Sequence, residues 1–150
     1  EFDGFWMQKA YRIPDNDCAC TPVGKAPEKT RPIGRYNVRS FITSLADGAR
    51  VARGRPVPVR GIAFDGGHGI REVQFSADDG KTWHAARLGQ DLGRYSFREW
   101  HAEFTPDKAG AYALKVRATN MAGETQPLDP LWNPSGYMRN GVETVRVDAA

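Results

Sequence analysis

Apolar and polar residues alternate in a series of short stretches that runs from residue 36 to the end of the chain. In the stretch 111–120, for example, every second residue from Tyr112 to Ala118 is apolar. This period of two predicts a strand with one buried face. Seven such stretches, with Gly, Pro and Asp between them, cover residues 36–45, 56–64, 69–76, 81–88, 96–104, 111–120 and 142–147. Their length and spacing predict an all-β fold, an immunoglobulin-like antiparallel β-sandwich over residues 36–150.

The first third of the chain has a different character, and we expect an irregular N-terminal extension there. Residues 1–14 contain a cluster of large apolar side chains that is too small to form its own core: Phe2, Phe5, Trp6, Met7 and Tyr11. We expect this cluster to pack on a larger body that the chain does not contain. Residues 15–35 are rich in Pro, Gly, Lys and small polar residues without periodicity, which predicts a linker.

Length and composition narrow the possible classes of protein. A chain of 150 residues with 40% hydrophobic residues suits one domain with a single core. The net charge of +3 is small and the Arg residues are scattered, which does not favour nucleic-acid binding. No run of 18 apolar residues is present, so no membrane span is expected. The first residues lack the pattern of an export signal, so an exported protein would have had its signal upstream or would have lost it by removal.

One hairpin motif stands out. The stretch from Ser76 to Trp83, SADDGKTW, has the outline of the Asp-box hairpin of sialidases and other β-propellers. Asp79 and Gly80 suit a tight turn, and Trp83 can cover the open end of the hairpin and is expected in the core. A propeller needs about four to eight blades, whereas the motif occurs once here. We therefore interpret it as a structural hairpin.

The residues alone reveal no catalytic set and no metal site. Cys18 and Cys20 are one residue apart, and they are either two thiols in a loop or a strained, labile disulfide. A single Cys-x-Cys lacks the second pair that a zinc ribbon needs. His68, His84 and His101 have no partner at metal-ligand spacing. The sequence thus predicts a β domain without its own active site.

The order of motifs after residue 36 resembles the carboxy-terminal dimerisation domain of the sulfite oxidase family of molybdenum enzymes. The pairing of the SADDGKTW hairpin with the later motifs between Gln126 and Asn140 makes the resemblance specific. The matching stretches are ADGARV, VRGIAFDGGHGIREVQFSADDGKTWHAARL, REWHAEF, LKVRATNMAGETQP and WNPSGYMRNGVETVRV. The leader FWMQKAYRIPD is similar to the end of the molybdenum-cofactor domain that precedes this module in the family.

The resemblance implies that catalysis and dimerisation belong to different domains. Residues 1–14 would be the tail of the cofactor domain, residues 15–35 the linker and residues 36–150 the dimerisation domain. The preceding domain would bind molybdenum through a pterin dithiolene and one Cys thiolate and oxidise sulfite to sulfate. This chain would hold no cofactor, would be inactive in isolation and would form a homodimer through the sandwich. A cytochrome is a candidate partner, and the bacterial look of GYMRN suggests the periplasm.

The resemblance also implies one contact with substrate. In eukaryotic members an Arg two residues after a Trp-Asn pair lines the anionic pocket. Trp132 and Asn133 match that pair, but the corresponding residue is Ser135. Arg139 could serve instead, because the planar guanidinium holds an oxyanion through two hydrogen bonds and stays charged.

A second hypothesis comes from another class of protein. The chain could be a free-standing binding module of the fibronectin or carbohydrate-binding kind, in which exposed aromatic side chains form a ligand platform. This hypothesis requires no upstream domain, so the mass of the natural polypeptide distinguishes the two.

Overall fold

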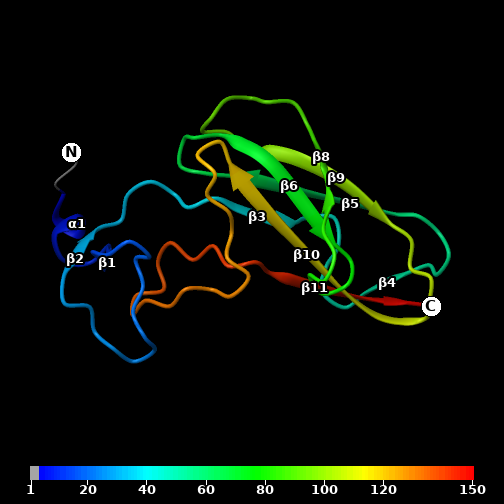
Figure 1. Ribbon diagram of the computed structural model, residues 1–150, viewed down its shortest axis with the longest axis horizontal. Coiled ribbons are helices and arrows are strands. Elements are labelled where there is room, and N and C mark those ends of the chain that lie inside the picture. The colour runs from blue at the N-terminus through cyan, green and yellow to red at the C-terminus, as the bar shows by residue number, and fades with distance from the viewer. Residues whose placement is uncertain (1–3) are drawn as a thin grey trace.

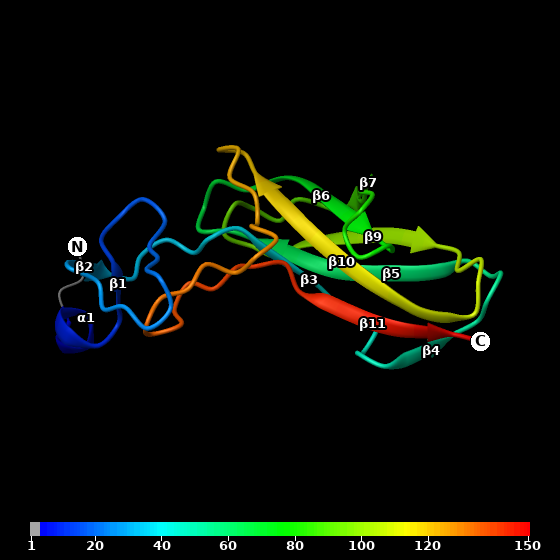
Figure 2. The same ribbon diagram turned by 60° about the horizontal axis from the view of Figure 1, so that its bottom comes forward.

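A computed structural model describes residues 4–150, and it consists of two stacked β-sheets with a small lobe at one end (Figures 1 and 2). The five-stranded sheet has the order β4 (Ala49–Val51), β11 (Thr144–Ala149), β10 (Gly110–Asn120), β6 (Ile70–Ser76) and β7 (His84–Ala85). The four-stranded sheet has the order β3 (Arg39–Ile42), β5 (Val57–Phe64), β9 (Arg98–Phe104) and β8 (Arg87–Leu88). All pairs are antiparallel except β4 with β11. The predicted β-sandwich is confirmed.

The strand pattern departs from the sequence prediction in two places. The stretch 81–88 forms two short strands, and β7 joins one sheet while β8 joins the other. Ala86 lies between them, and its backbone N–H donates to the Val73 carbonyl as the chain crosses over. Strands that switch sheets form the corners of such sandwiches. Strand β4 was not predicted, because three residues are too few to establish a period of two and its pairing with β11 is remote in sequence.

The core lies between the sheets and is built from their inward-facing residues. Trp100 on β9 is fully buried at its centre, opposite Leu114 and Val116 on β10. Gly61 on β5 pairs with Trp100 across the ladder, and a β-carbon there would lie 2.3 Å from the Trp100 ring and 2.1 Å from the Phe41 carbonyl oxygen. Glycine is therefore required at this position by the close approach of the indole.

The N-terminal extension forms the lobe. Helix α1 (Phe5–Lys9) leads into β1 (Arg12–Pro14), which pairs with β2 (Thr30–Pro32) across the intervening loop. The two three-residue strands were hidden from the sequence pattern, and the rest of the extension is irregular as predicted. None of the helices within residues 4–150 is long and apolar enough to cross a membrane.

The predicted apolar cluster of the leader divides into two parts. The Tyr11 ring lies 5.6 Å from the ring of Tyr137, so this residue contacts another part of the chain, and Ile13, which follows the cluster, is buried. Phe5 and Trp6 stay largely exposed at 69% and 62% and contact each other edge to face. Phe2 lies outside the described residues.

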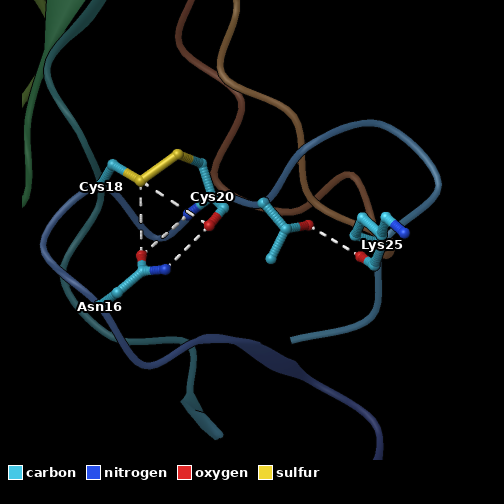
Figure 3. The surroundings of a disulfide bond; sticks show 5 residues. Asn16, Cys18, Cys20 and Lys25 are labelled. Atoms are coloured by element: carbon cyan, nitrogen blue, oxygen red, sulfur yellow. Dashed lines mark hydrogen bonds between the residues drawn. A yellow bond between two sulfur atoms is a disulfide. The ribbon is translucent and has the colours of Figure 1, made fainter. Parts of the chain in front are cut away.

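The two cysteines form a disulfide in the loop between β1 and β2 (Figure 3). The Asn16 side chain braces this loop: its amide nitrogen donates to the Cys20 carbonyl at 2.9 Å, and its oxygen accepts from the Cys20 N–H at 3.2 Å. Thr21 follows, and its N–H donates to the Trp132 carbonyl at 2.9 Å. The disulfide loop is thereby tied to the late segment of the chain.

A buried carboxylate organises the turn between β5 and β6. Asp65 accepts hydrogen bonds from the N–H groups of Gly67, His68 and Gly69 and from the Asn120 side chain, at 3.0–3.1 Å. Burial opposes the ionisation of Asp65, but these four donors outweigh it, so the pKa of Asp65 lies below its ordinary value. The carboxylate thus accepts the hydrogen bonds of three backbone N–H groups in a glycine-rich turn, where no strand ladder supplies carbonyl acceptors.

The close approach at Gly61 predicts a large effect of one methyl group. We expect Gly61→Ala to lower the free energy of unfolding by about 1–3 kcal/mol, because the strand and the Trp100 ring must move apart. Gly34→Ala is the control, since a β-carbon there meets nothing within 4 Å and the change should stay within about 0.5 kcal/mol. Chemical denaturation measures both. Equal stability of the two variants would contradict this packing.

The Asp65 network predicts a defined pH dependence. Because the folded-state pKa is lowered, the stabilisation is complete above the ordinary pKa of 3.8 and is lost as the pH falls through the folded value. Asp65→Asn should lower the free energy of unfolding by about 1–3 kcal/mol at pH 7, and the difference from wild type should shrink below pH 3.8. Asp148→Asn, on the exposed side of β11, is the control. A difference that is constant with pH would contradict the assignment.

Candidate functional site

The SADDGKTW hairpin is held by its own hydrogen bonds. The Ser76 hydroxyl donates to Asp78 at 2.7 Å and accepts from the Gly80 N–H, while Asp78 accepts from the Thr82 N–H and hydroxyl at 2.9 and 2.6 Å. The bonds from Thr82 hold the pKa of Asp78 well below its usual range. Asp79 and Gly80 form the turn, as predicted, and both take positive φ. The hydrogen bonds of these groups all lie within the hairpin and stabilise its turn.

The position of Trp83 corrects the expectation that it is a core residue. Its indole N–H donates to the Gly80 carbonyl at 2.9 Å, so the ring covers the end of the hairpin as expected. The ring is only half-buried, and the Arg117 guanidinium lies 4.2 Å from its centroid on the outer face of the sheet. The buried indole of the core is that of Trp100 instead. A cation–π contact stabilises the outer position of Trp83.

Potential metal ligands do not converge in the part of the chain that the structure describes. No three His, Cys, Asp or Glu side chains within residues 4–150 are placed to hold a metal ion. His68 contacts Arg35 at 2.7 Å, while His84 and His101 lie on different sheets. Both cysteine sulfurs are bonded to each other. These residues therefore offer no thiolate and no ligand set to a molybdenum centre.

The late segment from Trp132 to Asn140 has no regular structure, and side-chain amides fix it in place. Asn133 donates to the Tyr137 carbonyl at 2.9 Å, and Asn37 donates to the Met138 carbonyl at 2.8 Å. Asn140 donates to the Val38 carbonyl at 3.1 Å. Met138 takes a positive φ of 62°, which is uncommon for a residue other than glycine. Three amides thus hold a turn that the backbone alone would not favour.

The Gln126 amide extends this network into the gap between the sheets. Its oxygen accepts from the Ser40 hydroxyl on β3 at 2.6 Å and from the Ala118 N–H on β10 at 3.0 Å. Its nitrogen donates to the Asn140 carbonyl at 3.0 Å. Because Ser40 and Ala118 belong to different sheets, one buried side chain joins both sheets to the late segment.

Arg139 lies between the anchored residues Met138 and Asn140 and projects into solvent. Its backbone position is fixed on both sides, yet none of the ion pairs among residues 4–150 involves its guanidinium. Arg139 borders two hollows. The smaller one, about 390 Å³, also contains Trp132, Asn133 and Ser135. The structure therefore brings four of the residues of the predicted anion site together.

The larger hollow, about 610 Å³, was missed by sequence reasoning. Aromatic rings form a large part of its walls, while Arg39 and Arg139 supply positive charge and Asp65 negative charge: the ring-bearing residues are Tyr36, Phe64, Tyr95, Phe97 and Tyr137. Arg39 is engaged with Glu143 at 2.5 Å. The sequence carried a signal, since several aromatic residues lie at strand ends, but only the strand register places those ends side by side.

The hairpin and the late segment do not form one site. Asp78 and Thr82 border a separate hollow beside β7, which shares no residue with either hollow at Arg139. The residues singled out from the sequence thus divide into a group that builds the hairpin, Asp79, Gly80 and Trp83, and a group that lines the smaller hollow, Trp132, Asn133 and Arg139.

The relatives found by comparison with known proteins include two kinds of enzyme, sulfite oxidases and nitrate reductases. The chain is 30% identical to the mitochondrial sulfite oxidase of Macaca fascicularis over 97% of its own length and 28% of that protein. It is 34% identical to a nitrate reductase of Phaseolus vulgaris over 92% of its own length and 15% of that protein. The chain spans less than a third of either relative.

A solved structure and a family profile extend the match. The sulfane dehydrogenase SoxCD from Paracoccus pantotrophus superposes with a TM-score of 0.71 over 93% of this chain and 35% of that chain, at 24% identity, which supports the same fold. Residues 30–149 match the family described as the Mo-co oxidoreductase dimerisation domain. The resemblance noted from the sequence is confirmed, and the chain belongs to this dimerisation-domain family of the molybdenum-cofactor oxidoreductases.

Proposed function

We propose that this chain is the dimerisation domain of a molybdenum-dependent sulfite oxidoreductase that converts sulfite to sulfate. The observation that carries the proposal is the match of residues 30–149 to the dimerisation-domain family, together with sulfite oxidase relatives that align over nearly the whole chain. The sulfite oxidase of Macaca fascicularis is more than three times as long as the part that aligns with this chain, which leaves room for a separate catalytic domain. In the proposed assembly, residues 1–14 end that domain, residues 15–35 link it and residues 36–150 form a homodimer.

The cofactor belongs to the other domain in this proposal. The family depends on a molybdenum cofactor, and residues 4–150 do not fit it, because the two cysteine sulfurs are paired and the carboxylates and imidazoles of this part do not cluster. In this proposal the chain contributes the contact that forms the homodimer and the positive charge of Arg139. A cytochrome as electron acceptor and a periplasmic location complete the proposal.

Arg139 is proposed as a contact for the anionic substrate. The amides of Asn37 and Asn140 fix its backbone, and its side chain is free of carboxylate partners among the described residues. An unpaired guanidinium on a fixed backbone can bind an oxyanion without first breaking an ion pair. Ser135 borders the same hollow, so Arg139 could take the role of the Arg that eukaryotic members have at that position.

Because the relatives include both sulfite oxidases and nitrate reductases, the substrate has to be determined by direct assay. Sulfite and nitrate are both oxyanions, and an Arg contact suits either one. Sulfite oxidation and nitrate reduction by the intact natural polypeptide, each measured with an artificial electron carrier, decide between them. Turnover of sulfite supports the proposal, and turnover of nitrate alone would replace its substrate.

The same assay tests Arg139. In the intact enzyme, Arg139→Ala should raise the KM for sulfite about 10- to 100-fold, because a charge-assisted hydrogen bond of about 1.5–3 kcal/mol is lost. Arg53→Ala, an exposed Arg between β4 and β5, is the control and should leave KM unchanged. Adding Ser135→Arg to Arg139→Ala should recover part of the loss, since both positions border one hollow. An unchanged KM in Arg139→Ala would refute the role.

A further inference from the structure

The Cys18–Cys20 disulfide encloses a very short piece of chain. A single residue lies between the two cysteines. In the chain-entropy account, a disulfide stabilises a fold by restricting the unfolded chain, and this effect grows with the number of residues that it encloses. The Cys18–Cys20 bond therefore contributes little to the stability of the lobe, and a purely structural role does not account for it.

The disulfide is open to solvent on the Cys18 side. Cys18 is exposed and Cys20 is half-buried, in the loop between β1 and β2. Thiol–disulfide exchange requires a thiolate to reach one sulfur of the bond, and exposed disulfides are the ones that react in this way. Cys18 is therefore the expected point of attack.

The residue between the cysteines is held in an unfavourable backbone conformation. Ala19 has a φ of 49°, in the left-handed region where the β-carbon of an L-residue crowds the following carbonyl oxygen. Such a conformation persists only where the surrounding structure enforces it. The ring that the disulfide closes around Ala19 supplies this constraint, so opening the bond allows Ala19 to relax.

An acceptor for a free thiol is already in place. The side-chain oxygen of Asn16 lies 3.4 Å from the Cys18 sulfur (Figure 3). A disulfide sulfur has no hydrogen to donate, whereas a Cys18 thiol can donate to this oxygen. The reduced loop thus gains a hydrogen bond that the oxidised loop lacks. This acceptor and the conformation of Ala19 both favour the open form.

Opening the bond also affects the late segment. The Asn16 oxygen now accepts from the Cys20 N–H at 3.2 Å, so a Cys18 thiol would compete with that N–H for one acceptor. Cys20 precedes Thr21, whose N–H donates to the Trp132 carbonyl at 2.9 Å. Trp132 lines the smaller hollow. The redox state of the loop is thereby linked to one wall of that hollow.

We propose that the Cys18–Cys20 disulfide is a redox-active site that a dithiol opens, and that its opening releases the hydrogen bond from Thr21 to Trp132. The inference goes beyond the proposed function and does not depend on which oxyanion the intact enzyme converts.

The exchange reaction balances in atoms and electrons. One thiolate of the dithiol attacks the Cys18 sulfur, forms a mixed disulfide and displaces the Cys20 thiolate. The second thiolate attacks the dithiol's own sulfur in the mixed disulfide, closes a disulfide within the dithiol and displaces the Cys18 thiolate. The dithiol loses two electrons to the protein disulfide. The protons that the dithiol gives up end on the cysteine thiols.

Titration of the oxidised intact natural polypeptide with dithiothreitol tests the redox site. Trapping of free thiols, followed by the mass of the peptide that contains both cysteines, measures the extent of opening. We expect Ala19→Gly to lower the equilibrium constant for opening about five- to thirtyfold, the factor that corresponds to about 1–2 kcal/mol of left-handed strain. Ala26→Gly, in the same loop at a residue without positive φ, is the matched control and should leave the constant unchanged.

The point of attack has its own readout. In a rapidly quenched reaction with a monothiol, fragmentation of the same peptide should place the mixed disulfide on Cys18. A mixed disulfide on Cys20 alone would overturn the assigned point of attack.

Amide hydrogen exchange tests the link to Trp132. The Thr21 N–H should exchange about two- to tenfold faster after reduction, the factor that matches the loss of one net hydrogen bond. The Ile33 N–H, which donates to the Tyr11 carbonyl at 2.9 Å in the same lobe, is the control and should exchange equally in both forms. A Cys18→Ser/Cys20→Ser variant cannot close the bond and should show the fast Thr21 rate without reductant.

The contrary outcomes are equally specific. A bond that dithiothreitol fails to open in the folded polypeptide, or that opens to the same extent in wild type and Ala19→Gly, would overturn the redox site. A Thr21 exchange rate that is the same in the oxidised and the reduced polypeptide would overturn the link to Trp132. Either result would leave the proposed function intact.

Discussion

The arrangement of this domain depends on one buried amide, that of Gln126, in the gap between the two sheets. Burying an amide costs several kcal/mol unless its hydrogen bonds are satisfied, on the order of 2–7 kcal/mol in apolar surroundings. Here the oxygen accepts from β3 and β10, and the nitrogen donates to the late segment. Loss of the late segment would leave this amide with an unpaired donor. The position of the late segment is thereby coupled to the packing of the sandwich.

This coupling explains how a segment without regular structure can present a charge at a fixed place. Arg139 belongs to a loop, but Asn37, Gln126 and Asn140 anchor the residues on either side of it. Amides do not titrate, so the anchoring is independent of pH over the range in which the sandwich is stable. The same loop also supplies one wall of the larger hollow.

The strands were predictable because the information that specifies them is local. The alternation from Tyr112 to Ala118 and the turn residues Asp79 and Gly80 determine a strand and a hairpin without reference to distant residues. The amide network was not predictable, since Asn37 and Met138 are 101 residues apart. Trp83 shows the remaining difficulty: its place in the hairpin followed from the motif, but its exposure depended on Arg117 from another strand.

The candidate site was predicted in part for the same reason. The Trp132–Asn133 pair and Arg139 were found from a motif, and the structure places them around one hollow. The larger hollow draws its aromatic rings from four separate stretches of the chain, so only the tertiary fold could reveal it. The central claim, that this domain serves a molybdenum enzyme, is tested most directly by the intact mass and molybdenum content of the natural polypeptide. The account predicts a chain much heavier than 16.6 kDa that carries molybdenum, whereas a metal-free native chain of 16.6 kDa would contradict it and favour a free-standing binding module.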